Sequence, residues 1–104
     1  MKADKTAVVL IEFQNEFCKE GGKLHDLVKD EMDRIGTVAN GARLLEAARD
    51  AGCLVIHTPF VFDENWVDDN CVCGIIAGAK EGGAFRAGEW GTEIIDAMAP
   101  QEYE

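Results

Sequence analysis

The residues best suited to chemistry in this chain stand at the ends of two apolar segments. Glu12 directly follows the apolar run Ala7–Ile11, and His57 directly follows the run at residues 53–56. A carboxylate at the end of a buried strand is partly desolvated, which raises its pKa and suits it to act as a general base. We therefore predict Glu12 as the catalytic residue. The alternative is a solvated or salt-bridged glutamate in a loop.

Other polar residues near these two ends have both functional and structural interpretations. Gln14 and Asn15 could orient the amide or carboxylate of a substrate, or they could cap a turn. His57 could be a metal ligand or a proton shuttle, or it could bond to the backbone. The second histidine, His25, lies in a separate loop, so the spacing does not indicate a metal site. We predict no metal and no cofactor.

The four cysteines do not form a recognisable metal or redox motif. They stand at Cys18, Cys53, Cys71 and Cys73. The last two are separated by one residue, whereas metal and redox pairs usually have two, and no second pair follows. Cys18 lies six positions after Glu12, but we find no cationic neighbour in the sequence that would lower its pKa and make it a nucleophile. Because there is no secretory signal, we expect free thiols and a cytoplasmic location.

Composition limits the classes of partner. The chain has 104 residues and a formal net charge of -10, which disfavours nucleic acid and anionic membrane surfaces as partners. No stretch approaches the roughly 20 apolar residues of a membrane span. The glycines do not form the Gly-x-Gly-x-x-Gly pattern of dinucleotide-binding proteins after a strand. A small-molecule substrate is the partner that we expect.

The elements that would position Glu12 form a strand–helix–strand pattern. Residues 7–13 and 53–59 are apolar without alternation, which predicts parallel strands buried on both faces. Between them, apolar residues spaced by three and four predict one helix that begins between Asp26 and Asp33 and ends near Ala51, capped by Gly52. Thr92 is expected to cap a short helix over residues 93–98. The predicted class is α/β with a parallel sheet, whose ligands bind at the carboxyl ends of the strands.

The irregular segment after the second strand is rich in aromatic residues. Phe60, Trp66, Phe85 and Trp90 could line the mouth of a pocket, or they could form a small satellite core. The periodicity does not decide between these two interpretations.

Several segments, taken in order, resemble a known family. Residues 7–17 read AVVLIEFQNEF, and a glycine pair follows at Gly21 and Gly22. Residues 39–52 and 55–59 supply a helix and a second strand, and residues 83–95 follow the irregular segment. This order resembles the N-terminal half of an isochorismatase-like cysteine hydrolase, whose first strand usually leads into Asp-x-Gln-x-x-Phe. Residues 83–95 resemble the part that leads into the third strand of that family.

The resemblance implies a doubly wound, three-layer parallel sheet and a triad of Asp, Lys and Cys. Glu12 occupies the aspartate position, and the expected lysine and nucleophilic cysteine lie beyond Glu104. Residues 1–104 are then expected to be a single, incomplete domain: the first βαβ unit, a loop-rich segment and a short helix. Family members hydrolyse small amides or cleave the vinyl ether of isochorismate. The candidate substrate-binding residues are Gln14, Phe17, Trp66 and Phe85.

Two alternatives to a hydrolase stay open. The replacement of the family aspartate by Glu12 is compatible with a non-catalytic, degenerate hydrolase or an interaction subunit. A two-stranded sheet has unpaired edges, which favour a homo-oligomer or a complementing chain. A receiver-type signalling domain also uses acidic strand ends, but it needs an acidic pair after its first strand, where this chain has only Glu12.

Overall fold

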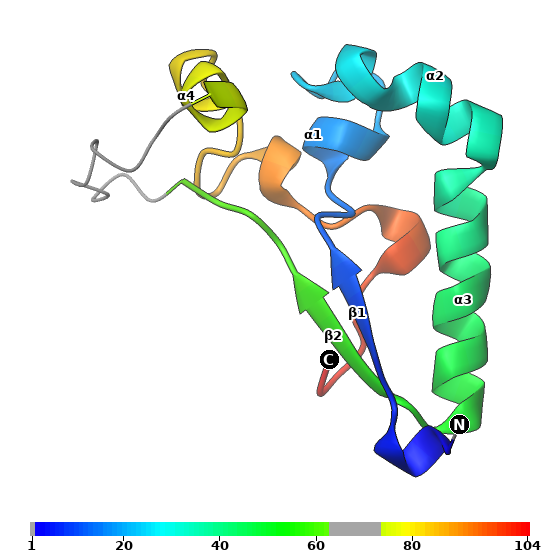
Figure 1. The fold of residues 1–104 in the computed structure, drawn as a ribbon. Helices are drawn as coiled ribbons and strands as arrows, with labels where there is room; N and C mark the ends of the chain where they lie inside the picture. Colours follow the sequence, from blue (N-terminus) through cyan, green and yellow to red (C-terminus); the bar gives the residue numbers. More distant parts are fainter. Residues whose placement is uncertain (1, 63–73) are drawn as a thin grey trace.

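Two parallel strands and the helices that connect them organise the chain (Figure 1). The computed structural model describes residues 2–62 and 74–104. In chain order the elements are η1 (Ala3–Lys5), β1 (Ala7–Ile11), α1 (Asn15–Cys18), α2 (His25–Ile35), α3 (Thr37–Ala51), β2 (Leu54–Thr58), α4 (Gly74–Glu81), η3 (Trp90–Thr92) and η4 (Asp96–Met98). The labels η mark 3₁₀ turns. The predicted α/β class is confirmed, and the described part is consistent with an incomplete isochorismatase-like fold.

The parallel pairing of the two strands is also confirmed. The register runs from Ala7 opposite Leu54 to Ile11 opposite Thr58. Helices α2 and α3 make the crossover that parallel strands require. The two strands therefore end at the same edge of the sheet, where β1 leads into Glu12 and β2 leads into Pro59.

The prediction that both faces of the strands are buried is wrong. Leu10 and Val55 are buried on the face that α3 covers, but Val9 and Ile11 point to the other face and are exposed. Figure 1 shows α3 running beside the sheet on one side. Continuous apolar character predicts two covered faces, and the described residues cover one.

The predicted single helix is two helices. Gly36 separates α2 from α3, because it adopts the left-handed conformation with φ of 65°. Such a residue ends a helix, and glycine adopts this conformation without a steric penalty. The predicted end of the second helix is confirmed: Gly52 is left-handed, and its N–H donates to Ala48 and Arg49.

The segment after residue 90 differs from its prediction. Instead of one helix over residues 93–98 it forms the two turns η3 and η4, and the Thr92 hydroxyl donates to the Glu89 carbonyl at 2.7 Å. The reason is that backbone groups of this segment form hydrogen bonds with the residues that follow β1 instead of the hydrogen bonds of a helix. Ile95 N–H donates to the Phe13 carbonyl at 3.0 Å, and Asn15 N–H donates to the Glu93 carbonyl at 2.9 Å.

The main core lies between the sheet, α3 and η4. Its buried members are Leu10, Leu45, Ala48, Val55, Ile95 and Met98. Gly41 on α3 allows close packing here, because a Cβ at this position would lie 2.5 Å from the Cε of Met98. No helix within residues 2–62 and 74–104 has the length and apolar character to cross a membrane.

Candidate active site at the end of β1

Glu12 ends β1 through its own backbone conformation. Its φ is 58°, and its N–H still donates to the Thr58 carbonyl at 3.2 Å. This left-handed conformation is uncommon for residues other than glycine, and strained backbone of this kind clusters at functional sites. The residue is half-buried at the edge of the sheet where both strands end. A strained backbone therefore holds the predicted catalytic residue at the position where parallel sheets bind ligands.

Gln14 holds two distant segments against the end of β1. Its side chain is fully buried, and its Nε2 donates to the carbonyls of Phe60 and Thr92 at 2.8 and 2.7 Å. Its Oε1 accepts the Phe60 N–H at 2.8 Å. The amide thus bonds to the backbone at positions 46 and 78 residues away. This arrangement favours a positioning role for Gln14.

Asn15 and Glu16 extend this polar anchor. The Asn15 Nδ2 donates to the Trp90 carbonyl at 2.9 Å. The buried carboxylate of Glu16 accepts the Lys23 N–H at 2.7 Å through Oε1 and the Phe85 N–H at 2.9 Å through Oε2. Residues 14–16, which we call the polar anchor, therefore hold four segments around the end of β1. All three residues are buried: Gln14 is the N-cap of α1, and Asn15 and Glu16 are the first residues of the helix.

The aromatic candidates Phe17 and Phe85 lie together in a second cluster. Their ring centroids are 5.2 Å apart, and Phe60 stands edge-on to Phe85 at 5.3 Å. Phe85 is buried, and its φ of 55° is unusual for a bulky side chain. The structure brings these two candidates together next to the polar anchor, because Glu16 binds the Phe85 N–H. Trp66 lies outside the described residues.

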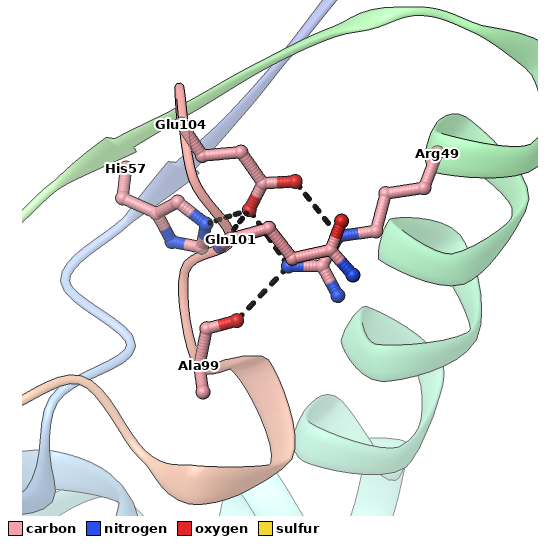
Figure 2. A network of polar contacts seen from close by, with 5 residues as sticks. All are labelled: Arg49, His57, Ala99, Gln101 and Glu104. Carbon is pink, nitrogen blue, oxygen red and sulfur yellow. Dashed lines mark hydrogen bonds and ion pairs between the residues drawn. The ribbon is translucent and has the colours of Figure 1, made fainter.

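His57 faces α3 rather than the carboxyl edge of the sheet. Figure 2 shows its ring against the carboxylate of Glu104, with Nε2 and Oε2 3.2 Å apart. Arg49 on α3 donates to both oxygens of this carboxylate, at 2.8 and 2.7 Å. The hydrogen bond from Arg49 is the main cause that lowers the pKa of Glu104 to about 2. The partner of His57 is therefore a carboxylate, which neither interpretation of the sequence anticipated.

Cys18 is not activated in the described structure. Burial raises the pKa of its thiol, while the neighbouring Lys19 acts in the opposite direction and is outweighed. The sequence does supply a cationic neighbour, so our statement that none exists is wrong. Cys18 and His25 line a cavity of about 370 Å³ against α2 and α3. Glu12 does not line this cavity, and within the described ranges no three His, Cys, Asp or Glu residues form a group that could hold a metal.

Glu16 is the positioning residue that the sequence interpretation missed. Its buried carboxylate bonds to two backbone N–H groups, and Gly91 leaves room for it, since a Cβ there would lie within 2.3 Å of its Oε2. The only signal in the sequence is its place in the Gln-Asn-Glu-Phe segment after β1. A charged residue in that segment looks solvent-exposed until the loops that donate to it are known.

The whole of this arrangement falls within one family match. The model of the isochorismatase domain matches residues 6–104, which includes β1, the polar anchor and the aromatic cluster. The chain belongs to the isochorismatase family. Glu12 lies in the part of the family domain that the resemblance assigned to the acidic member of the triad.

Individual relatives agree with the family match. The chain is 31% identical to ureidoacrylate amidohydrolase RutB of Variovorax paradoxus over 97% of its length, and 30% identical to RutB of Agrobacterium fabrum over 97%. The RutB of Caulobacter vibrioides is 29% identical over 92% of the chain. These matches cover 45%, 50% and 48% of the relatives, so the chain spans about half the length of the curated relatives it matches.

Proposed function

We propose that residues 1–104 form the N-terminal part of an isochorismatase-family hydrolase domain in which Glu12 is the catalytic base. The observation that carries the proposal is the left-handed backbone of Glu12 at the carboxyl edge of the sheet. The family match over residues 6–104 supports it. The relatives are ureidoacrylate amidohydrolases, which supports a small ureido compound or related amide as the substrate.

In this proposal the chemistry is acyl transfer to a thiol. Glu12 accepts the proton of a cysteine thiol, the thiolate attacks the amide carbonyl carbon, and the amine departs with that proton to leave a thioester. Water then hydrolyses the thioester. The lysine and the nucleophilic cysteine come from outside residues 1–104. Since Glu12 is one methylene longer than aspartate, its carboxylate lies roughly an ångström from the family position, which can cost about 100-fold in rate.

The remaining candidates take supporting roles in the proposal. Gln14 positions the segments at Phe60 and Thr92, because its amide bonds to both. Phe17 and Phe85, whose ring centroids are 5.2 Å apart, form an apolar wall beside the site in this proposal, and Trp66 is kept as a substrate-binding candidate on the sequence alone. The free thiols of Cys18 and Cys53 support a cytoplasmic setting.

The test is hydrolysis by the gene product that carries this sequence, with ammonia release measured from a panel that includes ureidoacrylate and nicotinamide. Glu12→Gln is expected to lower kcat/KM by about 10²–10⁴-fold, because an amide cannot accept the proton. Glu12→Asp should retain turnover. The matched control is Glu20→Gln at an exposed position. Turnover that survives Glu12→Gln but disappears in Cys18→Ala would overturn the assignment of the base.

A non-catalytic interaction subunit is the second candidate. It is favoured by the exposed apolar face of the sheet, which a self-contained enzyme domain would cover. Absence of turnover on the whole panel, together with stable binding to another polypeptide, would select this candidate.

A further inference from the structure

One lysine closes a ring of hydrogen bonds beside the aromatic cluster. The Nζ of Lys23 donates to the Gly83 carbonyl at 2.5 Å, and the Lys23 N–H donates to Oε1 of Glu16 at 2.7 Å. The other carboxylate oxygen of Glu16 accepts the Phe85 N–H at 2.9 Å. Because Gly83 and Phe85 are two residues apart in the same loop, these contacts form a closed ring. We call the four residues the clamp.

Lys23 reaches the clamp from a distant part of the sequence. It lies between α1 and α2, whereas Gly83 lies 60 residues later, between α4 and η3. The Nζ of Lys23 is also 3.7 Å from Oε2 of Glu89, but the two side chains are 46% and 49% exposed, and ion pairs this exposed contribute little. An ammonium group that donates to a carbonyl forms a charge-assisted hydrogen bond, which is stronger than a neutral one. The bond to Gly83 is therefore the contact through which Lys23 holds the loop.

Phe85 needs such support because its backbone is strained. Its φ of 55° is in the left-handed region, and strained backbone of this kind persists only where the surrounding structure fixes it. Both backbone polar groups of Phe85 are engaged, since its N–H donates to Glu16 and its carbonyl accepts the Phe62 N–H at 2.7 Å. Lys23 adds a third point of attachment, two residues before Phe85.

The position of the Phe85 ring in turn supports Phe17. The Phe85 ring is only 2% exposed, whereas Phe17, whose ring centroid is 5.2 Å away, is half-buried. Phe85 therefore packs behind Phe17 and supports it from the inside. We propose that Lys23 is a positioning residue of the active site, which fixes Phe85 and, through it, the wall at Phe17. Lys23 acts through these side chains without contact to the substrate, and the inference rests on the proposed function.

The experiment compares the wild-type gene product that carries this sequence with its Lys23→Met variant, which keeps the apolar stem but cannot donate to Gly83. Hydrogen exchange of residues 83–89, measured by mass spectrometry, should become about tenfold faster. KM on the amide panel should rise about fivefold while kcat stays within about twofold, because the wall binds substrate and transition state alike. The matched control is Lys29→Met, which is 44% exposed and loses an ion pair with Asp26. It should match the wild type in both measurements.

The outcomes separate this inference from the proposed hydrolase function. Lys23→Arg restores a charged donor and should bring both the exchange rate and KM back towards the wild-type values. Unchanged exchange in Lys23→Met, or faster exchange with an unchanged KM, would overturn the positioning role and leave the hydrolase intact. A loss of kcat at constant KM would also overturn it, because it would place Lys23 in the reaction itself. If the wild type hydrolyses no compound of the panel, the hydrolase function fails, and the role of Lys23 in it fails too.

Discussion

Buried polar side chains at the start of α1 do as much to build the site as the apolar core does. Gln14 and Glu16 satisfy backbone groups of segments that would otherwise be unpaired in a region shielded from water. An unpaired buried polar group costs about 1–3 kcal/mol, so each side chain fixes loops that no helix or strand holds. The polar anchor thereby sets the position of Phe85 relative to the end of β1.

Replacing Glu16 by glutamine tests this role at a single residue. Glu16→Gln keeps the shape, but its NH₂ group faces one of the two backbone N–H groups that the carboxylate accepts, from Lys23 and Phe85. We expect the free energy of unfolding to fall by about 1–3 kcal/mol, measured by urea denaturation. Glu20→Gln at an exposed position is the control and should change it by less than about 0.5 kcal/mol. Equal stability of the two variants would contradict the role.

At the residue scale, the sequence predicts where a residue lies in the fold but not which residues its side chain bonds to. The location of Glu12 after an apolar run correctly placed it at the carboxyl edge of the sheet. The bonds of Gln14 reach residues 46 and 78 positions away, and local patterns carry no information about such distances. The same reason explains why Glu104 was not foreseen as the partner of His57.

Among the elements, α3 approaches η4 and the segment after β1 at a distance set by Gly41. A Cβ at Gly41 would lie 2.5 Å from the Cε of Met98 and 3.1 Å from the Cζ of Phe13. Both neighbours pack in the main core, so they have little room to move. The close approach of α3 to the end of β1 therefore depends on the missing side chain.

The same substitution in two helices gives opposite expectations. Gly41→Ala should be net destabilising, because overpacking costs about 1–3 kcal/mol and exceeds the gain in helix propensity of about 1 kcal/mol. Gly78→Ala in α4 meets no atom within 4 Å and should stabilise by about 0.5–1 kcal/mol. Thermal and urea unfolding measure both. Changes of the same sign in the two variants would contradict the close packing of α3.

At the scale of elements, the sequence predicted the two strands and the end of α3. It did not predict that Gly36 divides the helical segment into α2 and α3. Periodicity continues on both sides of Gly36, and a glycine within a periodic segment is compatible with either a helix interior or a break. The turns after residue 90 escaped prediction for a different reason. Their backbone groups bond to Phe13 and Asn15, so tertiary contacts override local helix propensity there.

For the whole molecule, the C-terminal segment is fixed to the sheet and to α3 by one charged group. Glu104 bonds to Arg49 and His57, and it also accepts the Gln101 N–H at 3.0 Å (Figure 2). Its side chain is only 10% exposed. Met98 and Ile95, earlier in the same segment, are buried in the main core. The ion pair and the core therefore hold this segment together against α3.

The charge state of Glu104 should make this attachment depend on pH. The pKa of Glu104 is about 2 in the folded chain, below its ordinary value of 4.5, so the folded state favours the charged form. Its contribution to stability is full above about pH 5 and is lost as the pH falls from 4.5 towards 2.

Glu104→Gln should be less stable than the wild type at pH 6, and the difference in free energy of unfolding between the two proteins should be smaller at pH 3. Urea midpoints at both pH values measure it. Glu102→Gln, an exposed neighbour with the same loss of charge, is the control. If the difference in urea midpoint between the wild type and Glu104→Gln is the same at pH 6 and pH 3, the carboxylate does not hold the segment through its charge.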